Sequence, residues 1–311
     1  MTGLTVVLGF GAVGRPTALA LLARGDAVRV AQRNRPADLP AQAEFVVCDV
    51  LDAASVRHAI DGAGQVVMAV AFPYDAKVWR ASWPTAMTNL VEACAATGAR
   101  LVLLDNLYQL GPQSEPRRED MPLTTGGGKP GVLADMTRIW QAATGRARVA
   151  ALRCTDFYGP GVTNSHLGAT GFGALARGKL ALVIPSPNLP HDFAYVPDIA
   201  RAIVTLLDAP DDAFGQVWNM PCAPTRTPHE ILRLGAEAIH AKPKIMGVPL
   251  WMLRAVGLVK PFMREVAEVG FTMDRPYQVD ATKFTRRFWS DVTPFEVGAP
   301  ATAGSFLPNA P

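Results

Sequence analysis

Three glycines near the start of the chain have the spacing of a phosphate-binding turn. The chain reads Gly9-Phe10-Gly11-Ala12-Val13-Gly14, which is the pattern Gly-x-Gly-x-x-Gly. The first glycine allows a tight turn, the second lets the backbone approach a pyrophosphate, and the third lets a helix pack closely. Residues 4–8 predict a buried parallel strand before the turn, and residues 15–24 predict a helix that ends at Gly25. This context predicts that the turn holds a dinucleotide.

The end of the second predicted strand, residues 27–31, bears on the choice between NAD and NADP. An Asp or Glu at this point would hydrogen-bond the ribose 2′-hydroxyl. The chain instead has Gln32, followed by Arg33, Asn34 and Arg35. Because a guanidinium offers a planar fork of donors to a 2′-phosphate, we expect NADP rather than NAD, with Gln32 and Arg33 at the cofactor. A solvated basic loop is the alternative.

Strand and helix patterns alternate through the first half of the chain. Strands are predicted at 44–48, 65–71, 100–104 and 147–152, and helices at 52–59, 82–97 and 132–143. The alternation predicts an α/β fold, a Rossmann-type doubly wound parallel sheet with a smaller C-terminal substrate-binding lobe. We expect a dinucleotide-binding domain over residues 1–156, with contributions from about 191–220, and a mainly substrate-binding lobe over 157–311.

Composition narrows the class of protein. The 311 residues carry a net charge of only +3 with scattered basic residues, so nothing indicates a nucleic-acid partner. Four distant cysteines without a Cys-x-x-Cys pair favour buried thiols over disulfides or metal ligands, and no metal site is expected: Cys48, Cys94, Cys154 and Cys222. The N-terminus lacks a signal-peptide pattern, so the expected compartment is the cytoplasm. A small-molecule substrate is the expected partner, and a homodimer is left open.

One long apolar stretch lies in the C-terminal part of the chain. Residues 246–263 are apolar but include Pro249, Arg254, Lys260 and Pro261. The interruptions predict an amphipathic helix with a break rather than a stable membrane insertion. A role in anchoring the protein to a surface is the alternative.

Further motifs lie along the whole chain. They are Cys48-Asp49-Val50, Asn89, residues 157–161 (Phe-Tyr-Gly-Pro-Gly), residues 191–198 (His-Asp-Phe-Ala-Tyr-Val-Pro-Asp) and residues 277–280 (Tyr-Gln-Val-Asp). With the glycine turn, they make the chain resemble the extended short-chain dehydrogenase/reductases, the NAD-dependent epimerase/dehydratase group. The resemblance covers nearly the whole length.

The resemblance implies several cofactor contacts. Asp49 matches the residue that contacts the adenine amino group, and Val50 lies beside the ring in such proteins. Ala69-Val70-Ala71 matches the strand end that passes under the cofactor ribose. Thr155 and Phe157 match the segment beside the nicotinamide. For Asp49, a cap at the side of a helix is the alternative reading.

The chain departs from this family at the proton relay. The family has a Ser or Thr at the end of the fifth strand and a later Tyr-x-x-x-Lys, whose Lys lowers the pKa of the Tyr phenol. None of the seven lysines here has a Tyr four residues before it. The alignment puts Asn106 at the Ser/Thr position, and Gly127 and Gly131 at the Tyr and Lys positions.

Three residues are candidates to replace the missing relay. Tyr108 lies two residues after Asn106, where strand ends face the cofactor; a packed loop aromatic is the alternative. Lys129 lies in the glycine-rich loop before the predicted helix; a solvated lysine is the alternative. Tyr158 is the third candidate.

The substrate pocket is inferred from element ends. Its expected lining is Phe72, Tyr74, Tyr158, His166 and His191. Relatives that act on nucleotide sugars commonly have an Arg at the position of His191, where it grips the diphosphate, and a neutral imidazole replaces it poorly. The preceding loop, 183–190, is uncharged and proline-rich. We expect a small, mostly apolar substrate; a diphosphate contact from Arg177 or Arg201 is the alternative.

The sequence therefore favours an NADPH-dependent oxidoreductase that reduces a small carbonyl or an activated alkene. Two other readings stay open. A non-catalytic dinucleotide sensor would keep the glycine turn and lose the relay. An isomerase, epimerase or lyase would hold its cofactor tightly.

Overall fold

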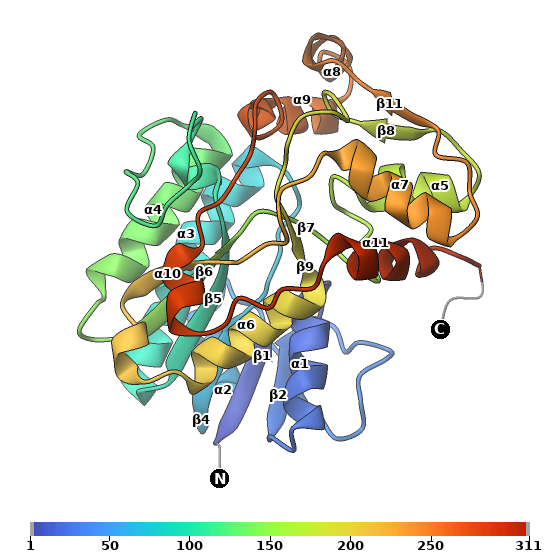
Figure 1. Cartoon of the computed structure of the whole chain (residues 1–311). Helices are drawn as coiled ribbons and strands as arrows, with labels where there is room; N and C mark the ends of the chain where they lie inside the picture. Colours follow the sequence, from blue (N-terminus) through green and yellow to red (C-terminus); the bar gives the residue numbers. More distant parts are fainter. Residues whose placement is uncertain (1–2, 309–311) are drawn as a thin grey trace. The chain divides into compact units, whose positions relative to one another are not determined.

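Seven strands form one sheet in the order β10-β6-β5-β4-β1-β2-β3 (Figure 1). Their bounds are β1 Leu4–Leu8, β2 Val28–Gln32, β3 Glu44–Val47, β4 Ala63–Met68, β5 Arg100–Asn106, β6 Arg148–Cys154 and β10 Gln216–Asn219. Strand β1 pairs in parallel with both β2 and β4, and the chain order reverses between β1 and β4. This is the expected Rossmann-type doubly wound parallel sheet.

The structure is a computed structural model that describes residues 3–308. The chain divides into two compact units. The first unit comprises Met1–Gln109, Leu123–Arg153 and Ile199–Trp218; the second comprises Leu110–Pro122, Cys154–Asp198 and Asn219–Pro311. The second unit thus includes residues 110–122, which the sequence predicts within the dinucleotide-binding domain.

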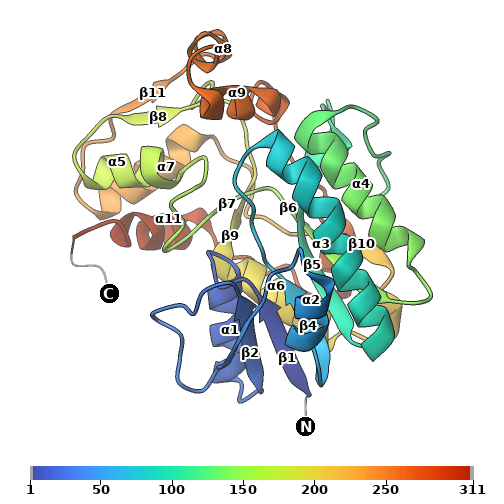
Figure 2. The ribbon, with the colours of Figure 1, turned by 180° about the vertical axis from the view of Figure 1, so that it is seen from behind.

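Helices cover both faces of the sheet (Figures 1 and 2). Their bounds are α1 Gly14–Ala23, α2 Ala53–Ala59, α3 Ala76–Thr97, α4 Gly128–Ala142 and α6 Val196–Asp208. Helices α2, α3 and α4 share one apolar core with the sheet, which includes Val56, Leu90, Trp140 and the strand residues Val66 and Leu101. Helices α1 and α6 lie on the other face.

Two helices begin earlier than the sequence patterns indicate. Helix α3 begins at Ala76 rather than 82, because the Asp75 carboxylate accepts hydrogen bonds from the backbone N–H groups of Lys77 (2.7 Å) and Val78 (3.1 Å). Helix α4 begins at Gly128 rather than 132. The predicted end of α3 is confirmed, since Gly98 adopts φ +73° and its N–H donates to the Cys94 carbonyl.

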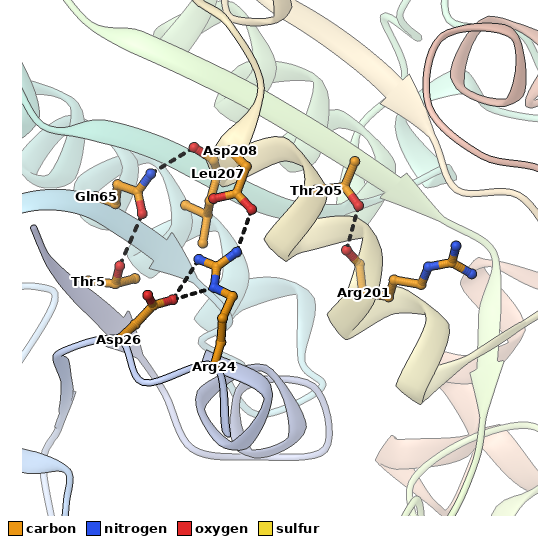
Figure 3. Close-up of polar contacts among 8 residues, drawn as sticks. All are labelled: Thr5, Arg24, Asp26, Gln65, Arg201, Thr205, Leu207 and Asp208. Atoms are coloured by element: carbon orange, nitrogen blue, oxygen red, sulfur yellow. Dashed lines mark hydrogen bonds and ion pairs between the residues drawn. The ribbon is translucent and has the colours of Figure 1, made fainter. Parts of the chain in front are cut away.

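A small polar network links α6 to the central strands β1 and β4 and to the end of α1 (Figure 3). The Thr5 hydroxyl donates to Gln65 Oε1 (3.1 Å), and Gln65 Nε2 donates to the Leu207 carbonyl (2.7 Å). Arg24, at the end of α1, pairs with Asp208 of α6. The ion pair is partly exposed and contributes little, whereas the buried Thr5 hydroxyl needs its partner. Gln65 is therefore the more important link.

A buried ion pair joins the ends of β5 and β6. The side chains of Asp105 and Arg153 are 0% and 2% exposed, and Arg153 Nε lies 3.3 Å from Asp105 Oδ2. Gln109 Nε2 donates to the same carboxylate oxygen at 2.6 Å. Burial raises the pKa of Asp105, while Arg153 and the hydrogen bonds from Asn106 and Gln109 act against that rise. The pair fixes the strand end that carries Asn106.

The second unit has its own small sheets and its own core. Strand β7 (Asp156–Tyr158) pairs in parallel with β9 (Phe193–Tyr195), and β8 (Ala181–Val183) with β11 (Ile245–Gly247). Its helices are α5 Gly173–Ala176, α7 Pro228–Ala238, α8 Leu250–Gly257, α9 Pro261–Glu268, α10 Thr282–Arg287 and α11 Phe295–Gly304. The core includes Phe172, Leu232 and Phe295. Helices α8 and α9 correspond to the helix with a break predicted at 246–263.

Candidate functional site

The glycine turn lies between β1 and α1, and two of its glycines are required by packing. Gly9 adopts φ +89°, and a Cβ atom there would lie 2.7 Å from the Ala69 carbonyl oxygen at the end of β4. A Cβ atom on Gly14 would lie 2.0 Å from the Gly9 carbonyl oxygen. Any side chain at these positions would therefore push α1 or β4 away from the turn.

Gly11 differs from the other two glycines. A Cβ atom at Gly11 would meet no heavy atom within 4 Å, and the residue is exposed. The packing of the chain itself therefore does not require a glycine there, whereas a pyrophosphate resting on the backbone does. With the N-terminus of α1 next to it, the turn has the open cradle and the N–H donors that fit a dinucleotide phosphate.

The end of β4 borders the same turn. The N–H of Ala69 donates to the Leu8 carbonyl (2.9 Å), which continues the pairing of β4 with β1 into the turn. Residues 69–71 thus follow β4 at the point where the strand order reverses, and ligands of open α/β sheets bind at this point. Ala69 and Val70 are partly exposed and Ala71 is exposed, so their backbone is accessible.

Gln32 shapes the turn from the end of β2. Its Oε1 accepts from the N–H of Phe10 (2.9 Å), and its Nε2 donates to the Asn34 carbonyl (2.7 Å). The amide therefore links the glycine turn to the basic loop. The guanidinium of Arg35 lies 5.5 Å from the Phe45 ring centre, while Arg33 is exposed. Arg33 is the guanidinium of this loop best placed to reach a ligand from solvent.

The predicted adenine segment is held by two neighbouring elements. Asp49 is exposed; its N–H donates to the Ser55 hydroxyl, and its Oδ1 accepts from the Leu51 N–H, both at 3.0 Å. Val50 is buried, and its carbonyl accepts from Asn89 Nδ2 of α3 at 3.0 Å. These bonds explain Asn89 structurally. The contact of Asp49 with adenine stays a prediction.

Asn106 ends β5 and fixes the turn that follows. Its Oδ1 accepts from the N–H of Tyr108 (2.8 Å), which opens a short 3-10 turn over Tyr108–Leu110. The amide oxygen is therefore engaged, and the amide nitrogen is the part with which Asn106 could polarise a substrate oxygen. Tyr108 is partly buried and packs against the core of the first unit.

Lys129 is not a solvated loop residue. It is fully buried in the first turn of α4, because that helix begins before it. Its Nζ lies 4.7 Å from the ring centre of Tyr74, which follows β4. A buried ammonium beside a phenol thus occurs in the first unit without the Tyr-x-x-x-Lys spacing. The two residues are 55 positions apart in the sequence, so no local pattern could have paired them.

The candidate Tyr158 is a buried residue of the second unit. The side chain is 1% exposed in the core of the second unit, with ring centres 5.2 Å from Tyr195 and 5.4 Å from Phe295. Burial raises the pKa of its phenol, which makes it a poor proton donor. Tyr158 is therefore a core residue, and its contact with a substrate stays a prediction that this burial disfavours. Thr155 is buried and Phe157 is partly exposed in the same unit, and their contact with a nicotinamide stays a prediction.

An imidazole and a carboxylate pair in the second unit. His191 Nε2 lies 3.0 Å from Asp156 Oδ2. The His191 ring stacks on Phe193 (4.4 Å), Tyr277 (4.9 Å) and His166 (5.6 Å between centres). Burial raises the pKa of Asp156, but the bond and charge of His191 outweigh it and hold that pKa below its usual value. Burial lowers the pKa of His166 to about 4, and the charge of His191 adds to this.

A buried arginine extends this stack. The Arg117 guanidinium is fully buried, and its centre lies 3.8 Å from the Tyr277 ring centre. Burial lowers the pKa of Arg117. The sequence predicts His166 and His191 as pocket residues but gives no signal for Asp156 and Arg117, because their partners come from distant segments.

Comparison with known proteins identifies the class. Residues 5–220 match the family described as "NAD dependent epimerase/dehydratase family". The match covers more than half of the chain, and the chain belongs to this family. A search of curated protein sequences gives no significant match.

Solved structures show the same fold at low sequence identity. The Bordetella bronchiseptica enzyme WbmH, solved with NAD+, is 19% identical with a TM-score of 0.76, over 98% of this chain and 99% of that one. UDP-N-acetylglucosamine 4-epimerase from Bacillus cereus is 15% identical with a TM-score of 0.74, over 96% and 95%. The dTDP-glucose 4,6-dehydratase of Bacillus anthracis, solved with NAD, is 16% identical with a TM-score of 0.77, over 97% and 96%.

The open space at Gly11 leads to a first prediction. Gly11→Val should abolish dinucleotide binding while the fold survives, because the side chain would occupy only the space of the pyrophosphate. Binding is measured by calorimetric titration with NADP and NAD, and folding by thermal unfolding. Gly14→Ala is the matched control; it should lower stability, since its Cβ meets the turn backbone. Unchanged affinity in folded Gly11→Val would place the cofactor elsewhere.

Proposed function

We propose that the protein is an NADPH-dependent oxidoreductase that reduces a small, mostly apolar carbonyl compound or activated alkene. The observation that carries this proposal is the buried Lys129 ammonium next to the Tyr74 phenol at the carboxyl edge of the sheet. It supplies the two chemical groups of a proton relay in a chain that lacks the motif of its family. When bound, the reduced cofactor supplies hydride to the substrate.

The preference for NADP rests on the basic loop after β2. No carboxylate stands at the end of β2, and the Gln32 amide is engaged with Phe10 and Asn34. Gln32 then acts by holding the loop, and Arg33 presents its guanidinium to the 2′-phosphate. A charge-assisted bond of this kind is worth about 1.5–3 kcal/mol, which corresponds to roughly 10- to 150-fold in affinity.

The second prediction tests this preference. Arg33→Ala should weaken NADPH binding by roughly 10-fold or more and leave NADH binding unchanged, because only NADPH has the 2′-phosphate. Calorimetric titration of both cofactors gives the affinities. Arg57→Ala, an exposed arginine on α2, is the control. If the wild type binds NADH more tightly than NADPH, the assignment is wrong.

The residues at the carboxyl edge have distinct parts in the reaction. When hydride reaches the substrate carbon, negative charge develops on the oxygen, and a phenol donates the proton that neutralises it. Tyr74 and Tyr108 follow the adjacent strands β4 and β5, and both are partly buried. The Lys129 ammonium favours the phenolate that Tyr74 leaves behind, and Asn106 Nδ2 stabilises the charged oxygen.

The third prediction separates these residues. If Tyr74 donates the proton, Tyr74→Phe should lower kcat by about 100-fold or more with cofactor affinity unchanged. If Tyr108 donates it, Tyr108→Phe should have this effect instead. Lys129→Met should shift the alkaline limb of the pH–rate profile if Tyr74 is the donor, and leave it in place if Tyr108 is. Asn106→Ala should also lower kcat. NADPH oxidation with small ketones and enals is the assay. Full activity in all four variants would remove them from the mechanism.

Two other functions give different results in the same assay. A non-catalytic sensor would bind the cofactor and never oxidise it. An isomerase, epimerase or lyase would retain cofactor through purification and show no net oxidation. The buried Lys129–Tyr74 pair favours a catalyst, since a sensor does not need a charged group buried beside a phenol.

The second unit bears on the class of substrate. His191 is engaged with Asp156, and a diphosphate would meet that carboxylate. The Arg177 guanidinium donates to the Ala169 carbonyl (3.0 Å). An uncharged, mostly apolar substrate therefore fits the described groups better than a nucleotide diphosphate sugar, although similar structures include nucleotide-sugar enzymes.

The fourth prediction concerns this class. With NADP bound, the wild type should show no binding to UDP-, GDP- or dTDP-sugars in calorimetric titration. Asp156→Asn tests the reason for this, because it removes the carboxylate charge that would repel a diphosphate and keeps the shape of the side chain. Micromolar binding of the wild type to any of these sugars would overturn the substrate class and leave the cofactor assignment standing.

A further inference from the structure

Helices α8 and α9 of the second unit carry exposed apolar side chains. Trp251 is 67% exposed, and Leu258 and Val259, in the turn between the helices, are 86% and 78% exposed. Met252 and Val256 of α8 are also exposed. We call these five residues the α8–α9 face. Large apolar side chains gathered in this way usually mark a binding surface.

Helix α8 departs from the usual amphipathic pattern, because apolar residues lie on its exposed side as well as on its buried side. Leu253 and Gly257 are buried, and Gly257 packs against Arg264 of α9. Trp251 and Met252 point away from this buried side by their spacing, and Val256 lies at its flank. Both sides of α8 are therefore apolar, and one of them faces solvent. Packing within the second unit accounts for the apolar residues on the buried side of α8 but not for those that face solvent.

The chain around this face carries an excess of positive charge. Two acidic residues, Glu265 and Glu268, lie in the last turns of α9, whereas residues 241–264 contain no Asp or Glu. They contain five basic residues, all exposed: Lys242, Lys244, Arg254, Lys260 and Arg264. Exposed apolar side chains among basic ones are typical of a segment that lies in the interface of an anionic membrane.

A hollow lies next to this segment in the same unit. It has a volume of about 380 Å³ and is lined by residues of α5 and the chain that follows it, and by Ile239, His240, Ala241, Lys242 and Lys244. Two ammonium groups at the rim of a hollow suit a single anionic headgroup. This feature is independent of the apolar side chains and indicates the same partner.

We propose that the α8–α9 face docks on the surface of an anionic phospholipid bilayer. Trp251, Leu258 and Val259 enter the boundary between headgroups and acyl chains, and the basic residues contact the phosphates. The docking is peripheral, because no helix within residues 3–308 is long and apolar enough to cross a membrane. The proposal does not depend on the reaction proposed above.

A second copy of the chain is a poorer occupant of this face. In a two-fold symmetric dimer the same surface meets itself. Five basic residues, which outnumber Glu265 and Glu268 of α9, would then face five others, and this excess of like charge opposes association. An anionic bilayer neutralises the same charges.

The test uses the full chain with extruded vesicles of phosphatidylcholine, alone or mixed two to one with phosphatidylglycerol. Co-sedimentation should show binding to the mixed vesicles, weakened by salt, and little binding to phosphatidylcholine alone. Trp251→Ser/Leu258→Ser/Val259→Ser should lower the affinity by roughly 10-fold or more. Lys242→Gln/Lys244→Gln should lower it by about 5-fold for each charge removed.

Matched variants elsewhere serve as controls. Val297→Ser removes an apolar side chain that is 57% exposed on α11, and Arg57→Gln/Lys77→Gln removes two exposed charges of the first unit. Both should bind the mixed vesicles like the wild type. The proposal is overturned if the wild type ignores mixed vesicles, or if controls and test variants lose affinity equally. It is also overturned if sedimentation without lipid shows a dimer that the serine variant abolishes, because a second copy would then cover the face. The charge variant keeps the test valid if the serine variant fails to fold.

Discussion

The close contact between the start of α1 and the end of β1 is the constraint on which the first unit depends. Gly14 lies so near the Gly9 carbonyl that no side chain fits, and a Cβ atom on Gly9 would lie 2.7 Å from the carbonyl oxygen of Ala69, which follows β4. These contacts bring the N-terminus of α1 to the point where the strand order reverses. The helix end and the free backbone of Gly11 then form a cradle for a phosphate, and no charged side chain is needed to build it.

The same sheet edge also gathers chemistry from separate segments. Strands β4 and β5 run in parallel, so Tyr74 and Tyr108 follow neighbouring strand ends. The early start of α4 buries Lys129 beside Tyr74. The buried Asp105–Arg153 pair fixes the end of β5, where Asn106 caps the following turn. These groups are distant in the sequence and meet only after the sheet has formed.

The second unit shows how a substitution changes a site beyond its own position. An imidazole at position 191 is paired with the Asp156 carboxylate and stacked among aromatic rings. Its neighbour His166 has its pKa lowered by burial, so it adds no positive charge near neutral pH. Asp156 thus places a carboxylate next to His191, and the one guanidinium described in this stack is the buried Arg117 against the Tyr277 ring. By contrast, positive charge is concentrated around α8 and α9, where apolar side chains are exposed.

The sequence by itself determined the features that depend on local order. The glycine turn, the alternating elements and the two-part helix after residue 246 are set by residues within a few positions of one another, where propensity and spacing act directly. Only the tertiary structure decided that Lys129 is buried, that Tyr158 is a core residue, and that Asp156 meets His191. Each of these depends on which distant segments pack together, because burial and charge pairing are set by neighbours in space rather than along the chain.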